Sequence, residues 1–105
     1  MRWRHKVEAA LAPSGLTFTQ WLVLEAIREL HEETDEDPIQ NEIAMRVELD
    51  RGSISRLIQR LERDGLLNRG VDRHFAAWSV TLNERAAVLL RDYRQRIDEL
   101  SVAAL

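Results

Sequence analysis

The stretch QNEIAMRVELDRGSISRLIQRLERDGLL, residues 40–67, decides how this chain folds. Its second half carries aliphatic side chains at the i, i+3, i+4, i+7 spacing of a helix with one buried face: Ile54, Leu57, Ile58 and Leu61. Asp50 precedes this run as an N-cap, and Gly65 follows it as a terminator. The pattern therefore predicts a helix over residues 50–64.

A shorter helix precedes this one. Asp37, Pro38 and Gln40 are typical of an N-cap, a first-turn proline and a reciprocal partner at the third helical position, so we expect a helix from Pro38 to Val47. Two short helices joined by a tight turn form a helix-turn-helix, which places its second helix in the major groove of DNA.

The outer face of the second helix combines small residues with basic ones. Glycine and serine are poor helix formers, so stability of the helix does not explain why they gather here. A need for close approach to the edges of DNA bases does explain it. Arginine suits bidentate contact with phosphate or guanine. We therefore predict that this face binds DNA through Arg51, Gly52, Ser53, Ser55, Arg56, Gln59, Arg60 and Arg63.

From Leu66 to Val80 the hydrophobic period changes to two, which predicts a β-hairpin over residues 66–80 with its tip near residues 70–73. A helix-turn-helix followed by a hairpin is a winged helix, and the fold class is mainly α with a small β-hairpin. The wing adds three candidate DNA contacts: Arg69, Arg73 and His74. We expect Thr81 to cap the last helix, with Glu84 at its third position.

Two further helices complete a single 105-residue domain. Pro13 and Gly15 end a short first helix, and a capping-box pair, Thr17 and Gln20, begins a second one that buries Trp21. We expect residues 16–82 to form the DNA-binding lobe. Residues 1–12 and 83–105 are then terminal helices for dimerisation.

The last helix carries an apolar stripe with steps of four and three residues. The pattern alone does not separate pairing with a partner helix from packing on the chain's own core. We expect a homodimer, because a two-fold axis presents two recognition helices to successive major grooves. The predicted dimerisation residues are Trp3, Val7, Leu90, Tyr93, Ile97 and Leu100.

Composition excludes several classes of protein. The chain has no cysteine, which excludes a disulfide framework, a thiolate zinc site and thiol catalysis. Its longest apolar run, residues 86–90, is far shorter than the about 20 residues of a membrane-spanning helix. We expect a cytoplasmic protein without membrane contact. The net charge is −3, but residues 46–73 hold seven arginines against five acids.

Neither a metal site nor an active site is predicted. The acidic segment of residues 31–37 lacks EF-hand spacing and paired histidines, so we interpret it as a solvated loop. The three histidines are scattered, and no nucleophile motif or glycine-rich phosphate loop is present. We predict no enzyme and no cofactor.

In this order the segments resemble the MarR (multiple antibiotic resistance regulator) family of bacterial winged-helix regulators. The resemblance is carried by LTFTQWLVLEAI from Leu16, the stretch from Gln40, the Asp-Arg pair at Asp72, and the Thr nine residues after Asp72. The family commonly has Gly where Glu48 stands and a second Arg where His74 stands.

The resemblance implies a sequence-specific double-stranded DNA-binding transcription regulator acting as a repressor. It also implies a small-molecule effector near Trp3, His5 and Trp21, although for these residues we favour the interpretation as an aromatic core. The alternative function, of another class, is a winged-helix protein–protein interaction module without direct DNA readout.

Overall fold

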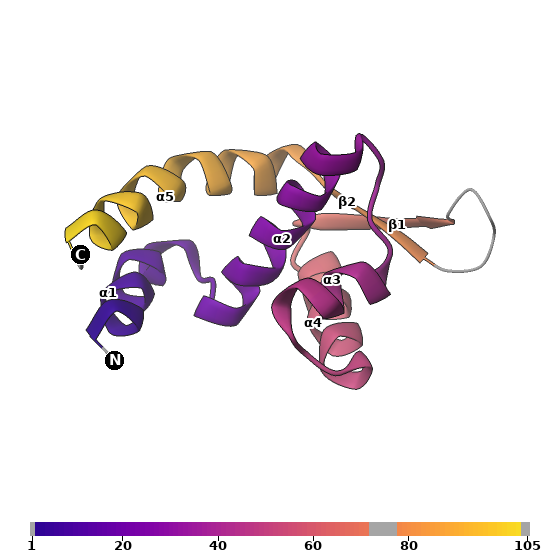
Figure 1. Cartoon of the computed structure of the whole chain (residues 1–105), viewed down its shortest axis with the longest axis horizontal. Helices are drawn as coiled ribbons and strands as arrows, with labels where there is room; N and C mark the ends of the chain where they lie inside the picture. Colours follow the sequence, from indigo (N-terminus) through magenta and orange to yellow (C-terminus); the bar gives the residue numbers. More distant parts are fainter. Residues whose placement is uncertain (1, 72–77, 104–105) are drawn as a thin grey trace.

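In the computed structural model of the protein, residues 2–71 and 78–103 are described. They form α1 (Arg2–Leu11), a 3₁₀ turn (Ala12–Ser14), α2 (Phe18–Thr34), α3 (Gln40–Val47), α4 (Arg51–Arg63), β1 (Leu67–Val71), β2 (Trp78–Leu82) and α5 (Glu84–Ala103). Helices α1 and α5 lie side by side at one end, and the hairpin extends from the other, beyond α3 and α4 (Figure 1). The predicted winged helix is confirmed.

Side-chain caps begin α2 and α4 where the sequence predicts them. The Thr17 hydroxyl accepts from the Gln20 amide at 3.1 Å, and the Gln20 side chain accepts from the Thr17 amide at 2.9 Å. At α4, Asp50 Oδ1 accepts from the Ser53 amide at 2.8 Å. Gly65, with φ +75°, takes the left-handed conformation that ends this helix.

Helix α3 begins two residues later than predicted, and the expected cap at Asp37 is wrong. The Pro38 carbonyl accepts from the Val80 amide at 2.8 Å, and Ile39 forms a β-bridge with Ser79. This pairing with β2 keeps Ile39 extended, at ψ 162°, so the first helical residue is Gln40. Glu42, in place of Gln40, reaches back to the Ile39 amide at 3.0 Å.

The turn between α3 and α4 depends on a left-handed residue that is not glycine. Glu48 has φ +58°, and its amide donates to the Ala44 carbonyl. This conformation closes α3 and turns the chain toward Asp50, which begins α4. A side chain at such a φ is strained, because Cβ crowds the following carbonyl.

The hairpin is antiparallel, with pairs from Leu67↔Leu82 to Val71↔Trp78. Strand β2 therefore runs past Val80, and the prediction that Thr81 caps the last helix is wrong, because Thr81 pairs with Asn68. Asn83 caps α5 instead, with its Oδ1 accepting from the Ala86 amide at 3.0 Å. Strand β1 extends through Val71, and the rest of the expected tip lies outside the described residues.

One continuous core joins the winged helix to the terminal helices. The stripe predicted to face a partner helix packs instead within the same chain, where α5 lies against α1. Leu90 and Ile97 are 1% and 2% exposed, and Val7 of α1 is fully buried. Trp3 joins the two helices at their far ends by donating to Ser101 Oγ at 3.0 Å. This stripe therefore gives no support to a partner helix, and the homodimer stays a prediction.

No helix within residues 2–71 and 78–103 is both long enough and apolar enough to cross a lipid bilayer.

Candidate nucleic-acid interface

Helix α4 has two sharply different faces. Ile54, Ile58 and Leu61 are at most 1% exposed and anchor the helix to the core. The opposite face is exposed at Arg51, Gly52, Arg56, Gln59, Arg60 and Arg63, while Ser53 and Ser55 are half-buried. The sequence-predicted contacts of this helix therefore lie together on one solvent-facing surface of a rigidly anchored element.

The first turn of α4 is organised around Asp50. Both the amide and the hydroxyl of Ser53 donate to its carboxylate at 2.8 Å, and these bonds lower the pKa of Asp50 below its ordinary value of 3.8. A Cβ at Gly52 would lie 3.3 Å from Asp50 Oδ1 and 3.4 Å from Arg56 Nη1. Glycine at this position therefore lets Arg56 fold back toward the cap.

Half of the described arginines between residues 46 and 69 are ion-paired within the chain. Arg60 contacts Asp64 at 3.2 Å, and Arg69 contacts Glu62 at 3.0 Å. The Arg60 pair is exposed on both sides, so water screens it strongly and its net stabilisation is small. Arg60 is therefore available to a phosphate.

The third paired arginine, Arg46, binds the acidic end of α2. It contacts Glu33 at 2.6 Å and Glu29 at 3.2 Å, and its hydrogen bond lowers the pKa of Glu33 below the ordinary 4.5. The interpretation of residues 31–37 as a solvated loop is therefore right about their exposure but wrong about residues 31–34, which form the last turn of α2. Within residues 2–71 and 78–103, no three His, Asp or Glu side chains gather as metal ligands.

Three arginines of α4 have no carboxylate partner within the described part of the chain: Arg51, Arg56 and Arg63. The contact from Arg56 to the Ser53 hydroxyl, at 3.5 Å, is long and holds it weakly. All three are exposed and make no salt bridge with the described residues, so we call them the uncompensated arginines, although Arg56 also lies near enough to Asp50 to help lower its pKa. Such a surface attracts the phosphates of a nucleic acid, because it releases their condensed counterions.

The wing candidates separate into two groups. Arg73 and His74 lie outside the described residues. Arg69 is held in β1 with its side chain 25% exposed between Glu62 and the ring of Trp78. Arg69 is therefore paired within the chain, unlike the uncompensated arginines of α4.

Comparison with known proteins identifies the family. The MarR family profile matches residues 14–74, more than half of the chain. The chain belongs to the MarR family. No curated protein sequence matches it significantly.

Solved structures agree with this assignment. A MarR-family transcriptional regulator from Rhodococcus sp. RHA1 is 27% identical, with a TM-score of 0.82 over 95% of this chain and 68% of the other. CouR from Rhodococcus jostii RHA1, bound to p-coumaroyl-CoA, is 27% identical, with a TM-score of 0.81 over 94% and 67%. The M. tuberculosis regulator MosR in complex with DNA is 25% identical, with a TM-score of 0.75 over 93% and 69%.

In this MarR-family chain, the residues expected near an effector form an aromatic cluster without His5. Trp3 meets Phe18 edge-on with ring centroids 5.7 Å apart, and Phe18 lies 5.9 Å from Trp21. His5 is exposed on α1. Trp21 also borders a pocket of about 590 Å³ between α2, α3 and α5. Phe18 directly follows the Thr17 cap, but no sequence pattern marks it as a member of this cluster.

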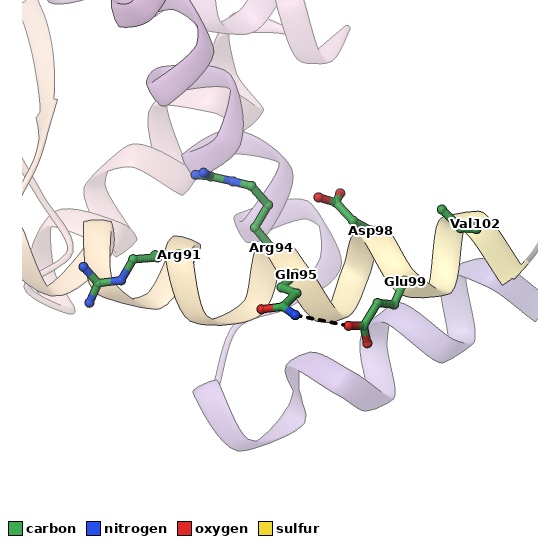
Figure 2. Close-up of a pocket in the computed structure, with 6 residues that line it drawn as sticks. All are labelled: Arg91, Arg94, Gln95, Asp98, Glu99 and Val102. Carbon is green, nitrogen blue, oxygen red and sulfur yellow. Dashed lines mark hydrogen bonds between the residues drawn. The ribbon is translucent and has the colours of Figure 1, made fainter.

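The outer face of α5, turned away from α1, is polar and open. Figure 2 shows Arg91, Arg94, Gln95, Asp98, Glu99 and Val102 along this face. Gln95 donates to Glu99 at 3.3 Å, and Arg94 reaches back to the buried carboxylate of Glu25 on α2 at 3.5 Å. Val102 is 69% exposed.

Proposed function

We propose that this MarR-family chain is a sequence-specific double-stranded DNA-binding transcription regulator that acts as a repressor. Helix α4 enters the major groove, and the β1–β2 hairpin lies as a wing at the neighbouring minor groove. The observation that carries the proposal is the set of uncompensated arginines on the exposed face of α4: Arg51, Arg56 and Arg63. The relative MosR, which is solved in complex with DNA, supports it.

Position along α4 divides the roles of its side chains. The N-terminal turns of a recognition helix reach base edges, so Arg51, Ser55 and Arg56 are the candidates for base readout. Arg60 and Arg63, further along the helix, are the candidates for phosphate contact, which sets affinity and register. Arg73 and His74 stay candidates for the minor groove or its phosphates.

The test is an unbiased selection of duplexes bound by the purified chain, followed by titrations of the selected and of a random duplex at several salt concentrations. We expect one enriched sequence, and log K falling with log salt by about 0.9 for each neutralised phosphate. No enriched sequence, together with binding that does not respond to salt, would leave the protein–protein interaction module as the better function. A reporter gene placed behind the selected site then tests repression.

We propose further that the chain is a homodimer and that its contact is the outer face of α5. Gln95 is the centre of this face, because Arg91 and Glu99 lie four residues to either side of it and Val88 and Val102 seven. A two-fold axis at Gln95 therefore sets Arg91 opposite Glu99 of the partner subunit and each Val88 opposite a Val102. Both valines are exposed in one chain, by 37% and 69%.

Charge exchange tests this contact without disturbing the core. Glu99→Arg should raise the dimer dissociation constant about 2- to 30-fold, because the two-fold axis repeats each exposed pair of about 0.2–1 kcal/mol. Adding Arg91→Glu should restore the dimer, and Arg96→Glu, on the flank of the same helix, should leave it unchanged. Sedimentation of all variants decides the question, and a double variant no more dimeric than Glu99→Arg alone would exclude this geometry.

The pocket beside Trp21 is our proposed effector site. It lies between α2 and α5, so a ligand there contacts both the DNA-binding lobe and a terminal helix. CouR, the relative solved with p-coumaroyl-CoA, supports an effector of aromatic acyl type. We expect p-coumaroyl-CoA to raise the melting temperature of the chain and Trp21→Ala to abolish the rise. No rise with the unmodified chain would exclude this ligand.

A further inference from the structure

One side chain touches the recognition helix and both strands of the wing. Arg69 of β1 donates to Glu62 Oε1 in the last turn of α4 through Nε at 3.1 Å, and its Nη2 lies 3.0 Å from the same oxygen. The centre of its guanidinium lies 5.6 Å from the ring centroid of Trp78 in β2. Glu62, Arg69 and Trp78 thus form a chain of contacts from α4 across the hairpin, which we name the wing strut.

The wing strut lies where the hairpin leaves the core. On the face of the hairpin that carries Arg69, Leu67 and Val80 are at most 1% exposed, whereas Trp78 is 53% exposed. The core therefore holds the inner half of the hairpin and not the outer half. On the edge of β2 that does not pair with β1, the bridge from Ile39 to Ser79 ties this strand to the start of α3.

The state of Arg69 differs from that of the uncompensated arginines. Its charge is matched by Glu62, and one face of its guanidinium is covered by an aromatic ring, a favourable arrangement for a cation. Arg51 and Arg63 are exposed on α4 without a carboxylate partner among the described residues. Moving Arg69 to a phosphate would break both of its contacts.

We propose that Arg69 is a positioning residue, which fixes the angle between α4 and the wing through Glu62 and Trp78. This inference rests on the proposed DNA binding and deepens it. Recognition by helix and wing together requires one fixed relative orientation, so that contacts in two neighbouring grooves form at once. The wing strut supplies that orientation, and Arg69 itself does not contact DNA.

The wing strut and simple electrostatics predict opposite effects of Glu62→Gln on DNA affinity. Removing a negative charge from a DNA-facing surface strengthens binding if charge alone matters. Glu62→Gln removes such a charge but also breaks the wing strut, so it should weaken binding to the selected duplex by about 2- to 30-fold. The matched control is Asp64→Asn at the same end of α4, which releases Arg60 and should strengthen binding.

The experiment measures affinity and salt slope for Glu62→Gln, Arg69→Gln, the double variant and Asp64→Asn. We expect the two single losses to be equal, the double variant to be no worse than either, and the salt slope to stay unchanged. Arg63→Gln should instead lower the slope by about one. Tighter binding by Glu62→Gln, or a lower slope for Arg69→Gln, would show that Arg69 contacts phosphate and would overturn the proposal.

A second measurement decides the wing strut without DNA. Amide hydrogen exchange in the free protein should become faster at Gly70 and Ser79 in Glu62→Gln but not in Asp64→Asn. Unchanged exchange would overturn the strut even if DNA binding were normal. Absence of binding to any duplex by the unmodified chain, with the exchange changed as expected, would instead overturn the proposed function and leave the strut in place.

Discussion

The replacement Arg56→Ala tests whether α4 reads bases. Arg56 is exposed, and its contact with Ser53 Oγ, at 3.5 Å, is too long to stabilise the fold appreciably. The free energy of unfolding should therefore stay unchanged. A bidentate arginine–guanine contact is worth about 1–3 kcal/mol of discrimination, which corresponds to about 5- to 150-fold in affinity for a half-site. The loss should fall on the selected duplex.

The assay compares the selected and random duplexes by fluorescence anisotropy over a series of salt concentrations. Arg96→Ala serves as the control, because it removes the same charge from α5, far from α4. A guanine contact lowers affinity for the selected duplex and leaves affinity for the random duplex nearly constant. Equal losses on both duplexes would reassign Arg56 to phosphate contact, and no loss on either would refute α4 as the recognition helix.

Three further predictions concern stability. The bonds from Ser53 depress the pKa of Asp50, so the stabilisation that they supply is present above its ordinary pKa of 3.8 and is lost as pH falls through the lower folded value. Asp50→Asn, which can also cap the helix, should remove this part of the acid sensitivity. Unfolding measured as a function of pH tests this, and a profile unchanged by the substitution would contradict it. Glu48→Gly relieves the left-handed strain at φ +58° and should raise the free energy of unfolding by about 0.5–1 kcal/mol in urea titrations, whereas Asp92→Gly within helix α5 should lower it by about 0.3 kcal/mol, because aspartate is itself a poor helix former. Ile58→Ala empties a fully buried site and should cost about 2–5 kcal/mol, against about 0.5–1.5 kcal/mol for Ile58→Val, and equal costs would mean that the surrounding core refills the space.

The sequence predicted the elements whose signals are local. The Thr17–Gln20 box and the Asp50 cap act within one helical turn, so the starts of α2 and α4 agree with the pattern. The start of α3 was missed because Pro38 and Ile39 pair with β2, residues remote in the sequence. The cap of α5 was missed because Thr81 matches the capping pattern as well as Asn83 does, and only the strand register separates them.

In the candidate site, too, local patterns could be predicted from the sequence and contacts between remote residues could not. Helical spacing alone was enough to gather the polar side chains of α4 on one exposed face. Sequence did not reveal which arginines are already ion-paired, because the partners of Arg46 lie on α2. The apolar stripe of α5 was read as a partner surface for a related reason, since its period is the same whether it meets a second chain or α1.

The hydrogen bond between Val80 and Pro38 has a consequence for the order of folding. An isolated two-stranded hairpin is marginal in water, so the wing depends on its contacts with the rest of the chain, and this tie is one of them. Its two residues are about forty positions apart, and closing so long a loop lowers the entropy of the chain before any stabilising contact has formed. The helices should therefore form first and the wing last. In pulsed deuterium labelling during refolding, the Val80 amide should gain protection after that of Ile58, and simultaneous protection would show that the wing takes part in nucleation.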